Sequence, residues 1–340
     1  MRKMVITAGA LAAVIASSVN ASIALDDAGK VKISGDFRLR AEMDERTKFN
    51  NGANEDRNRL RYRARFGISF KVNNNWSAKF RLATNTSSIN SPHVTFGDDP
   101  DIDYDQAYLS YSSGDMKIGA GKQPLNYWNS SEMVWDKDFN PDAISYAQKF
   151  GDIKINAAHI IINEGSWGNG DDTIEMLQAV YSKDKLTIAA GYFNNNNNSA
   201  AKAVTIFTAQ YKASDWRAVI ELADSDANTE GQAYALQFRK GLSDDKGVRI
   251  YYMYVEAQAT PGDGKYGQDD FPDQNGTGLS NFKGFRLQYD QKIDKHTAMD
   301  IRLYTMEAID AAFASLAASG NPYFADDERL RLQLNINLKF

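Results

Sequence analysis

The last fourteen residues of the chain, Asp327 to Phe340, alternate between polar and apolar side chains. One face of this segment would carry Leu330, Leu332, Leu334, Ile336, Leu338 and Phe340. The other face would carry Arg329, Arg331, Gln333, Asn335, Asn337 and Lys339. This period of two fits a β-strand and no helix. A secreted chain that ends on such a strand predicts a transmembrane antiparallel β-barrel whose final strand closes on its first.

The amino terminus has the features of a secretory leader. Met-Arg-Lys is followed by apolar and small residues up to Ala16, and Val-Asn-Ala at 19–21 forms a small-x-small cleavage site. The sequence therefore predicts a signal peptide over residues 1–21, because the apolar run is too short for a transmembrane helix. The chain contains no cysteine, which excludes a lipid-anchored cysteine and a disulfide framework.

Composition alone does not separate a soluble protein from a barrel. Hydrophobic residues make up 43% of the chain and the mean hydropathy is −0.51. No run after the leader approaches the roughly 18 apolar residues of a spanning helix, but a barrel hides its apolar surface in alternation. The net charge of −5 becomes −7 without Arg2 and Lys3, which argues against a nucleic-acid partner.

The alternation recurs along residues 22–340, and we expect about 16 strands, an even number as bacterial barrels require. The expected strands are 31–41, 59–72, 76–82, 102–112, 116–123, 143–150, 153–162, 173–182, 185–193, 203–212, 216–223, 232–240, 248–258, 282–292, 297–307 and 327–340. Short connections alternate with long ones, which is typical of periplasmic turns and extracellular loops. The long connections are 44–56, 86–101, 124–142, 163–172, 194–202, 224–231, 259–281 and 308–326.

Several motifs resemble the putative porin family of Gram-negative bacteria. They are Gly35–Arg40, Asp56–Arg65, Asn75–Ala78, Arg81–Thr84, Ala107–Tyr111, Gly121–Pro124 and Trp135–Pro141. The resemblance implies an outer-membrane barrel, without cofactors, for passive diffusion of small hydrophilic solutes and ions. Homotrimers are common for such barrels by family analogy, but the sequence shows no interface signature and leaves the oligomeric state open.

The strand parity places many basic residues on one arc of the inner wall. They are Arg38, Arg40, Arg59, Arg61, Arg63, Arg65, Lys79, Arg81, Arg329 and Arg331, with Arg286 and Arg302 on later strands. A one-residue slip would turn arginines toward lipid at roughly 2–4 kcal/mol each, so the register is strongly specified. Such a wall would concentrate anions and give a mild anion preference. Pairing with local acids such as Asp36 and Glu42 is compatible with that role.

The long connection 124–142 is the candidate constriction loop. It contains the carboxylates Glu132, Asp136, Asp138 and Asp142. Folded inward, it would set these acids against the arginine wall and create a narrow passage with a transverse field, by analogy with general porins. The alternative is a solvated outer loop whose acids only offset net charge.

Other functions have less support in the sequence. The only histidines, His93, His159 and His296, fall on different parts of the predicted barrel, which predicts no metal site or catalytic triad. We therefore expect no enzyme, although His159 could serve a hydrolase at the rim or lipid face. A structural or adhesive outer-membrane barrel without an open channel is the remaining alternative.

Overall fold

The computed structural model describes residues 23–25, 30–48, 52, 54, 56–85, 92–165, 170–196, 203–262, 266–267, 271, 280–317, 324 and 326–340. The expected signal peptide, residues 1–21, lies outside these ranges. Within them, no helix is long and apolar enough to cross a membrane.

Sixteen long strands dominate the structure. The first eight are β2 (Val31–Lys48), β3 (Arg57–Lys71), β4 (Trp76–Thr84), β6 (Ile102–Ser113), β7 (Met116–Lys122), β8 (Asp142–Phe150), β9 (Ile153–Asn163) and β10 (Asp172–Lys183). The others are β11 (Leu186–Asn195), β12 (Ala203–Lys212), β13 (Trp216–Ser225), β14 (Gln232–Ser243), β15 (Lys246–Val255), β16 (Phe282–Lys292), β17 (Thr297–Ala308) and β18 (Asp326–Lys339). Two-residue strands β1 (Ile23–Ala24) and β5 (Val94–Thr95) pair beside them, and a short helix α1 (Ala311–Ala317) follows β17.

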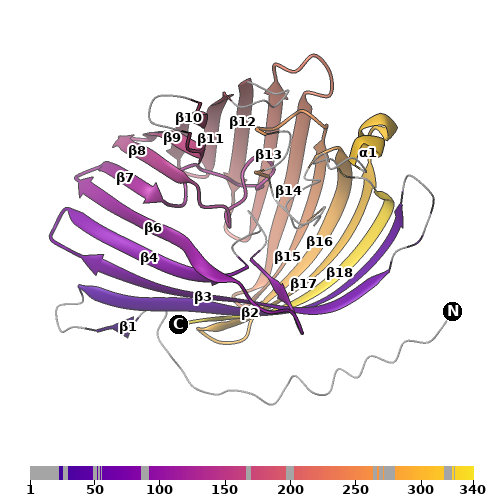
Figure 1. Ribbon diagram of the computed structural model, residues 1–340, viewed down its shortest axis with the longest axis horizontal. Helices are drawn as coiled ribbons and strands as arrows, with labels where there is room; N and C mark the ends of the chain where they lie inside the picture. Colours follow the sequence, from indigo (N-terminus) through magenta and orange to yellow (C-terminus); the bar gives the residue numbers. More distant parts are fainter. Residues whose placement is uncertain are drawn as a thin grey trace.

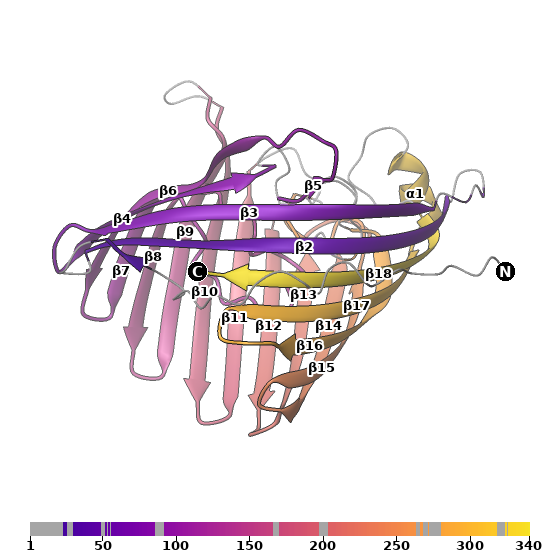
Figure 2. The same ribbon diagram turned by 90° about the horizontal axis from the view of Figure 1, so that it is seen from below.

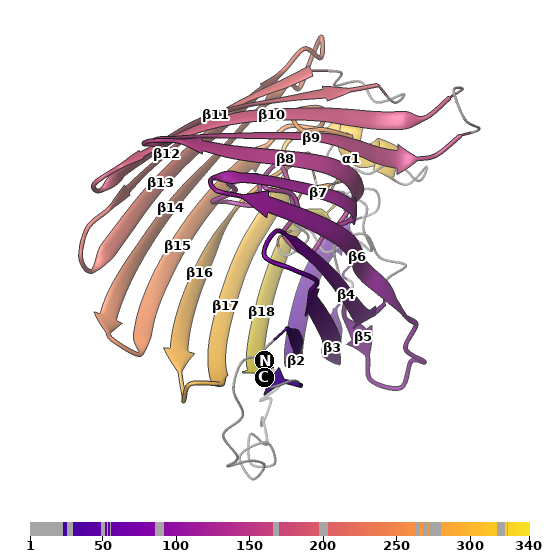
Figure 3. The ribbon, with the colours of Figure 1, turned by 90° about the vertical axis from the view of Figure 1, so that its left-hand side faces the viewer.

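Each long strand pairs antiparallel with the next one along the chain, and β18 pairs with β2. The sheet is therefore a closed antiparallel barrel, which confirms the predicted fold class and strand number. Figure 1 looks into the ring, Figure 2 shows β18 between β17 and β2, and Figure 3 shows β11 to β18 side by side along the wall.

The last strand shows why the alternation of the sequence produces this barrel. The side chains of Leu332 and Leu334 are each 37% exposed on the outer surface. Arg331 and Gln333, their neighbours in the sequence, are fully buried on the inner side. Successive side chains of a strand point to opposite faces, so one face forms the outer surface of the barrel and the other faces the bore.

The barrel closes at a seam between the first and last long strands. The backbone of Gly35 exchanges two hydrogen bonds with that of Phe340, with N–O distances of 2.8 and 3.0 Å. A Cβ atom at position 35 would lie 2.4 Å from Cζ of the Phe340 ring. Glycine is therefore needed at position 35, because the terminal aromatic ring packs directly over its backbone.

Candidate functional site

The connection between β7 and β8 lies inside the ring of strands (Figure 1). We call residues 124–141 the inner segment. It makes hydrogen bonds to walls on opposite sides of the bore, to β10, β13 and β14 on one side and to β3 and β6 on the other. The inner segment therefore crosses the lumen and divides the space within it.

Polar side chains of the barrel wall hold the first half of the inner segment. Gln178 of β10 accepts a hydrogen bond from the Trp128 backbone N–H at 2.8 Å and donates one to the Trp128 carbonyl at 2.9 Å. Gln237 of β14 donates to the Ser130 carbonyl at 2.9 Å, and the Ser131 hydroxyl donates to Glu221 of β13. These bonds satisfy backbone groups that would otherwise be buried without partners.

Aromatic packing holds the middle of the inner segment. The Trp135 ring stacks on Phe193 of β11 and on Tyr266 of the loop after β15, with centroid distances of 5.8 and 5.5 Å. Tyr127 meets the other side of this cluster at 5.2 Å from Phe193, and its burial raises the pKa of its hydroxyl well above the usual range. Trp135 is 3% exposed, so this part of the bore is filled by protein.

Asp138 ties the second half of the inner segment to β3. Its carboxylate accepts bonds from Arg63 at 2.8 Å and from Arg65 at 2.7 Å, and Asp36 of β2 bonds the same two guanidinium groups. Burial opposes ionisation of Asp138, but the charges of Arg63 and Arg65 outweigh it and hold its pKa well below the usual range. Asp138 is therefore a charged anchor at neutral pH.

The other three acids expected on this loop have different surroundings. Glu132 forms an ion pair with Lys137 at 2.6 Å, within the inner segment itself. Asp136 is buried and accepts a hydrogen bond from the Asp138 N–H. Asp142 is the first residue of β8 and is exposed beyond the end of the segment, so its expected place in the constriction loop is wrong. Strand β8 begins directly after Pro141, one residue earlier than predicted.

Arginines near the loop ends of β3 and β18 are paired with buried carboxylates. Asp44 accepts bonds from Arg329 at 2.6 Å, from Arg57 at 3.0 Å and from Arg331 at 3.4 Å. Glu42 accepts a bond from Arg59 at 2.5 Å. Arg329 and Arg331 are 2% and 0% exposed, so they meet carboxylates rather than open water. We call this inner face of β18, β2 and β3 the paired wall.

The remaining arginines of the predicted basic wall are also held by protein groups. Arg38 donates to Asn337 at 2.6 Å, Arg40 donates to Asn335 at 2.7 Å, and Arg61 donates to the carbonyl of His93 at 3.2 Å. Arg81 pairs with Asp105 of β6, and Lys79 lies half-buried beside it on β4. The sequence thus predicted the inner location of these residues but did not specify how many have acidic or amide partners.

His93 lies inside the barrel rather than on an outer loop. It precedes β5, is 4% exposed and faces the arginines of β2 and β3. Burial and the nearby charges of Arg40 and Arg38 lower the pKa of His93 well below the usual range, so its ring is neutral. His159 lies far from it in the sheet, on an exposed position of β9, where it hydrogen-bonds Glu175 at 2.6 Å.

The open space of the lumen lies between the inner segment and the later strands, and its larger part also reaches β2 and β3. A cavity of about 310 Å³ separates Ser130, Ser131 and Glu132 from the wall of β12 to β17. A second cavity of about 680 Å³ shares part of this lining and extends to the short turn after β14. It is also lined by Asp36, Arg38, Arg63 and Arg65 of β2 and β3. Together they form a passage from the short-turn end of the barrel to the inner segment.

Arginines from five consecutive strands line the smaller cavity: Arg217, Arg239, Arg249, Arg286 and Arg302. Arg249 pairs with Asp290 at 2.6 Å, and Arg302 pairs with Asp300 at 2.5 Å. Arg286 lies 3.7 Å above the ring of Tyr251, a cation–π contact. We call this face the open wall. Arg217, Arg239 and Arg249 were not among the predicted pore residues, because each is isolated in its own strand.

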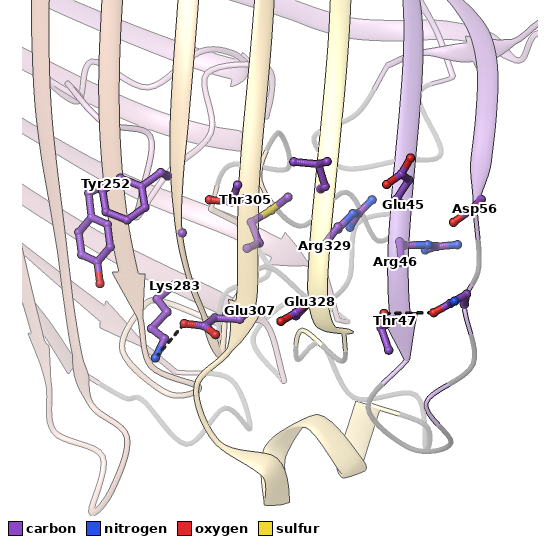
Figure 4. A pocket seen from close by; sticks show the side chains of 15 residues that line it. Glu45, Arg46, Thr47, Asp56, Tyr252, Lys283, Thr305, Glu307, Glu328 and Arg329 are labelled. Carbon is purple, nitrogen blue, oxygen red and sulfur yellow. Dashed lines mark hydrogen bonds and ion pairs between the residues drawn. The ribbon is translucent and has the colours of Figure 1, made fainter. Parts of the chain in front are cut away.

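A recess of about 940 Å³ is separate from this passage. It lies at the loop ends of β15 to β18, β2 and β3, where Lys283 and Glu307 form an ion pair at 3.1 Å (Figure 4). Its lining includes Phe285 and Leu330, which are 54% and 43% exposed on the outer surface. The recess therefore belongs to the outer rim and not to the bore. Among the described residues, no group of three or more His, Cys, Asp or Glu could hold a metal ion.

Comparison with known families supports the resemblance seen in the sequence. Residues 42–162 match the family model described as putative porin. This range spans β2 to β9 and includes the entire inner segment. No curated protein sequence matches the chain.

Solved structures similar to this chain include an outer membrane protein and a porin. The chain is similar to OmpT, an outer membrane protein of Vibrio cholerae, with a TM-score of 0.57, 10% identity, and coverage of 92% of this chain and 98% of that one. A mutant of Rh. blastica porin matches with a TM-score of 0.59, 12% identity, and coverage of 91% and 100%. A trimer form of OmpT matches with a TM-score of 0.56, 11% identity, and coverage of 91% and 99%. At these identities the likeness shows the fold.

Proposed function

We propose that the protein is an outer-membrane porin that lets small hydrophilic solutes and ions diffuse passively, with a preference for anions. The observation that carries this proposal is the passage between the inner segment and the open wall. Six cationic side chains and a single carboxylate line its narrower part among the described residues. A barrel of this size leaves space that side chains do not fill, and charges at a constriction set which ions pass.

The basic wall expected from the sequence has a different role in this proposal. Seven of its members shape the field of the pore from behind, as part of the scaffold: Arg40, Arg59, Arg61, Lys79, Arg81, Arg329 and Arg331. The other three, Arg38, Arg63 and Arg65, also border the larger cavity. The open wall contacts the solute. Asp138 fixes the inner segment at the distance from the open wall that defines the constriction, and Glu132 with Lys137 forms its rim.

The wider assignment rests on the family match and the fold. We propose export through a cleaved leader over residues 1–21, insertion into the outer membrane of a Gram-negative cell, and contact with its lipid along the outward apolar faces. We also propose a homotrimer, and no enzymatic role. Amino-terminal sequencing of the mature protein should start at Ser22, and chemical cross-linking in membranes should yield three subunits.

Conductance in planar bilayers tests the channel directly. Purified protein should produce ion-conducting steps, and a salt gradient should give a reversal potential of the sign that shows anion preference. Cation preference would remove the selectivity claim. The absence of conducting events would remove the channel itself and leave a structural or adhesive barrel. His159→Ala should leave conductance unchanged, because His159 lies outside the lumen.

A further inference from the structure

Three arginines of the open wall stand directly opposite one another across neighbouring strands. In the strand register, Arg217 of β13 is paired with Arg239 of β14, and Arg239 is paired with Arg249 of β15. Directly opposed residues have Cβ atoms about 4.5–5.5 Å apart, and like charges in this position destabilise a sheet. The barrel thus places three positive charges in one unfavourable row.

Partners within the protein do not offset this repulsion fully. Arg249 has Asp290, but Arg217 and Arg239 form no ion pair with any acid in the described ranges. Glu132, the one carboxylate that lines the smaller cavity, is already bonded to Lys137. Arg239 is exposed and Arg217 is half-buried, so both guanidinium groups can reach a solute in the cavity.

The surroundings add donors and restrict the size of a ligand. The amide of Gln210 on β12 and the hydroxyl of Ser130 lie on the same lining as the three arginines. A volume of about 310 Å³ holds a small anion with several waters and excludes large molecules. Guanidinium groups bind carboxylate and phosphate oxygens through paired N–H bonds, and several converging cations favour an anion of more than one charge.

We propose that Arg217, Arg239 and Arg249 form a binding site for a small multivalent oxyanion inside the channel. This site deepens the proposed porin function and rests on it. The bound anion relieves the repulsion along the row and accepts hydrogen bonds from more than one arginine. Monovalent anions such as chloride pass the same row without being retained. The channel therefore has both a general path for ions and a specific step for anions of the phosphoryl class.

Block of chloride current by phosphate tests the site. In bilayers bathed in potassium chloride at pH 7.5, added inorganic phosphate should reduce the current in a saturable way, and added nitrate should not. Sulfate should act like phosphate, because it is also divalent at this pH. Comparing inorganic phosphate with glycerol phosphate separates a free ion from a phosphorylated solute as the preferred ligand.

Variants distinguish phosphate binding at this site from the general electrostatic attraction of the pore for anions. Arg217→Gln with Arg239→Gln should raise the half-blocking phosphate concentration about tenfold or more, the equivalent of roughly 1.4 kcal/mol. Arg217→Lys with Arg239→Lys keeps the charge and should give an intermediate value. Lys292→Gln removes one charge from the larger cavity only and should change the value less than about twofold.

A second readout does not need conduction. Phosphate should raise the unfolding temperature of the folded wild-type barrel in detergent, and should not do so for the double glutamine variant. Anion-selective channels that phosphate neither blocks nor stabilises would overturn this site and leave the porin proposal intact. Phosphate stabilisation without any channels would support the site and overturn the porin proposal.

Discussion

One row of directly opposed residues runs across neighbouring strands and connects the two walls of the bore. The partners of its charged side chains differ between its two ends. At one end, Arg217, Arg239 and Arg249 oppose one another on β13, β14 and β15. The row continues through Gln288, Arg302 and Gln333, and reaches Glu42 of β2 and Arg59 of β3. At that end each cation faces a carboxylate or an amide.

This difference distinguishes charges that stabilise the fold from charges that face the passage. Buried charges that have lost water need partners. The paired wall supplies Asp36, Glu42 and Asp44, and the inner segment supplies Asp138. Charges that stay near water can remain without acids, and the open wall keeps its cations in contact with the passage. The number of arginines in a wall is therefore a weaker guide to selectivity than their access to the permeating solute.

We expect the largest effect on stability from a substitution that breaks ion pairs in the paired wall. Asp44→Asn should lower the free energy of unfolding by about 3–5 kcal/mol, because three arginine side chains would lose a buried charged partner. Urea unfolding of the barrel in lipid vesicles measures this. The matched change on the open wall, Arg239→Gln, should stay within about 0.5 kcal/mol of wild type, since it removes a repelling charge. Equal losses of stability in the two variants would contradict the distinction between the paired wall and the open wall.

For ion selectivity, substitutions in the open wall should have a larger effect than substitutions in the paired wall. A unit charge about 4 Å from an ion in water contributes about 1 kcal/mol, roughly a factor of five in local concentration. Arg217→Gln with Arg239→Gln removes two such charges and should therefore lower the chloride-to-potassium permeability ratio by at least about fivefold, measured from reversal potentials. Arg61→Gln with Arg63→Gln should also shift selectivity toward cations, but less, because these side chains are 5% and 4% exposed. A larger change in selectivity from the Arg61 and Arg63 substitutions would indicate that ions pass along the paired wall instead.

Asp138→Asn tests whether the paired wall positions the inner segment. Without its ion pairs to Arg63 and Arg65, the segment should detach from β3 more often, at a loss of about 1–2 kcal/mol for this half-buried group. Trypsin cleavage after Lys137 should become several-fold faster, and single-channel current should fluctuate more. Asp105→Asn breaks a comparable pair, with Arg81, away from the segment and should leave cleavage at Lys137 unchanged.

The smallest effect concerns pH. The pKa of Asp138 in the fold lies below its value of about 3.9 in an unfolded chain. Its ion pairs therefore stabilise the fold fully above that value, and their contribution is lost as pH falls through the folded pKa. Conductance should stay constant between about pH 7 and pH 5 if Asp138 alone controls the segment. A change in conductance within that pH range would indicate that another titrating group controls the position of the inner segment.

Much of the barrel could be predicted because alternation fixes which side of a strand each residue occupies. Leu332 and Arg331 have their expected faces. The inner segment falls in a long connection rich in acids and aromatic residues, but the sequence left open whether this connection folds inward or forms an outer loop. Asp142 was misplaced because a strand boundary differed by one residue. Burial of the Asp44 cluster could not be predicted, since it depends on packing across strands distant in sequence.

The open wall was missed for a specific reason. On β2 and β3 the arginines recur at every second residue, so the sequence itself displays a basic face. Arg217, Arg239 and Arg249 are spread over more than thirty residues, and only the register of β13, β14 and β15 brings them together. A sequence search that aligns inward positions across consecutive strands could have found them.

Thiol labelling tests the central claim most directly, because the natural chain contains no cysteine. Gln210→Cys places one thiol on the cavity beside the open wall, and Gln333→Cys places one in the buried network of the paired wall. We predict that a negatively charged, membrane-impermeant thiol reagent lowers the current through the Gln210→Cys channel and leaves the Gln333→Cys channel unchanged. Loss of current only in the Gln333→Cys channel would contradict the account.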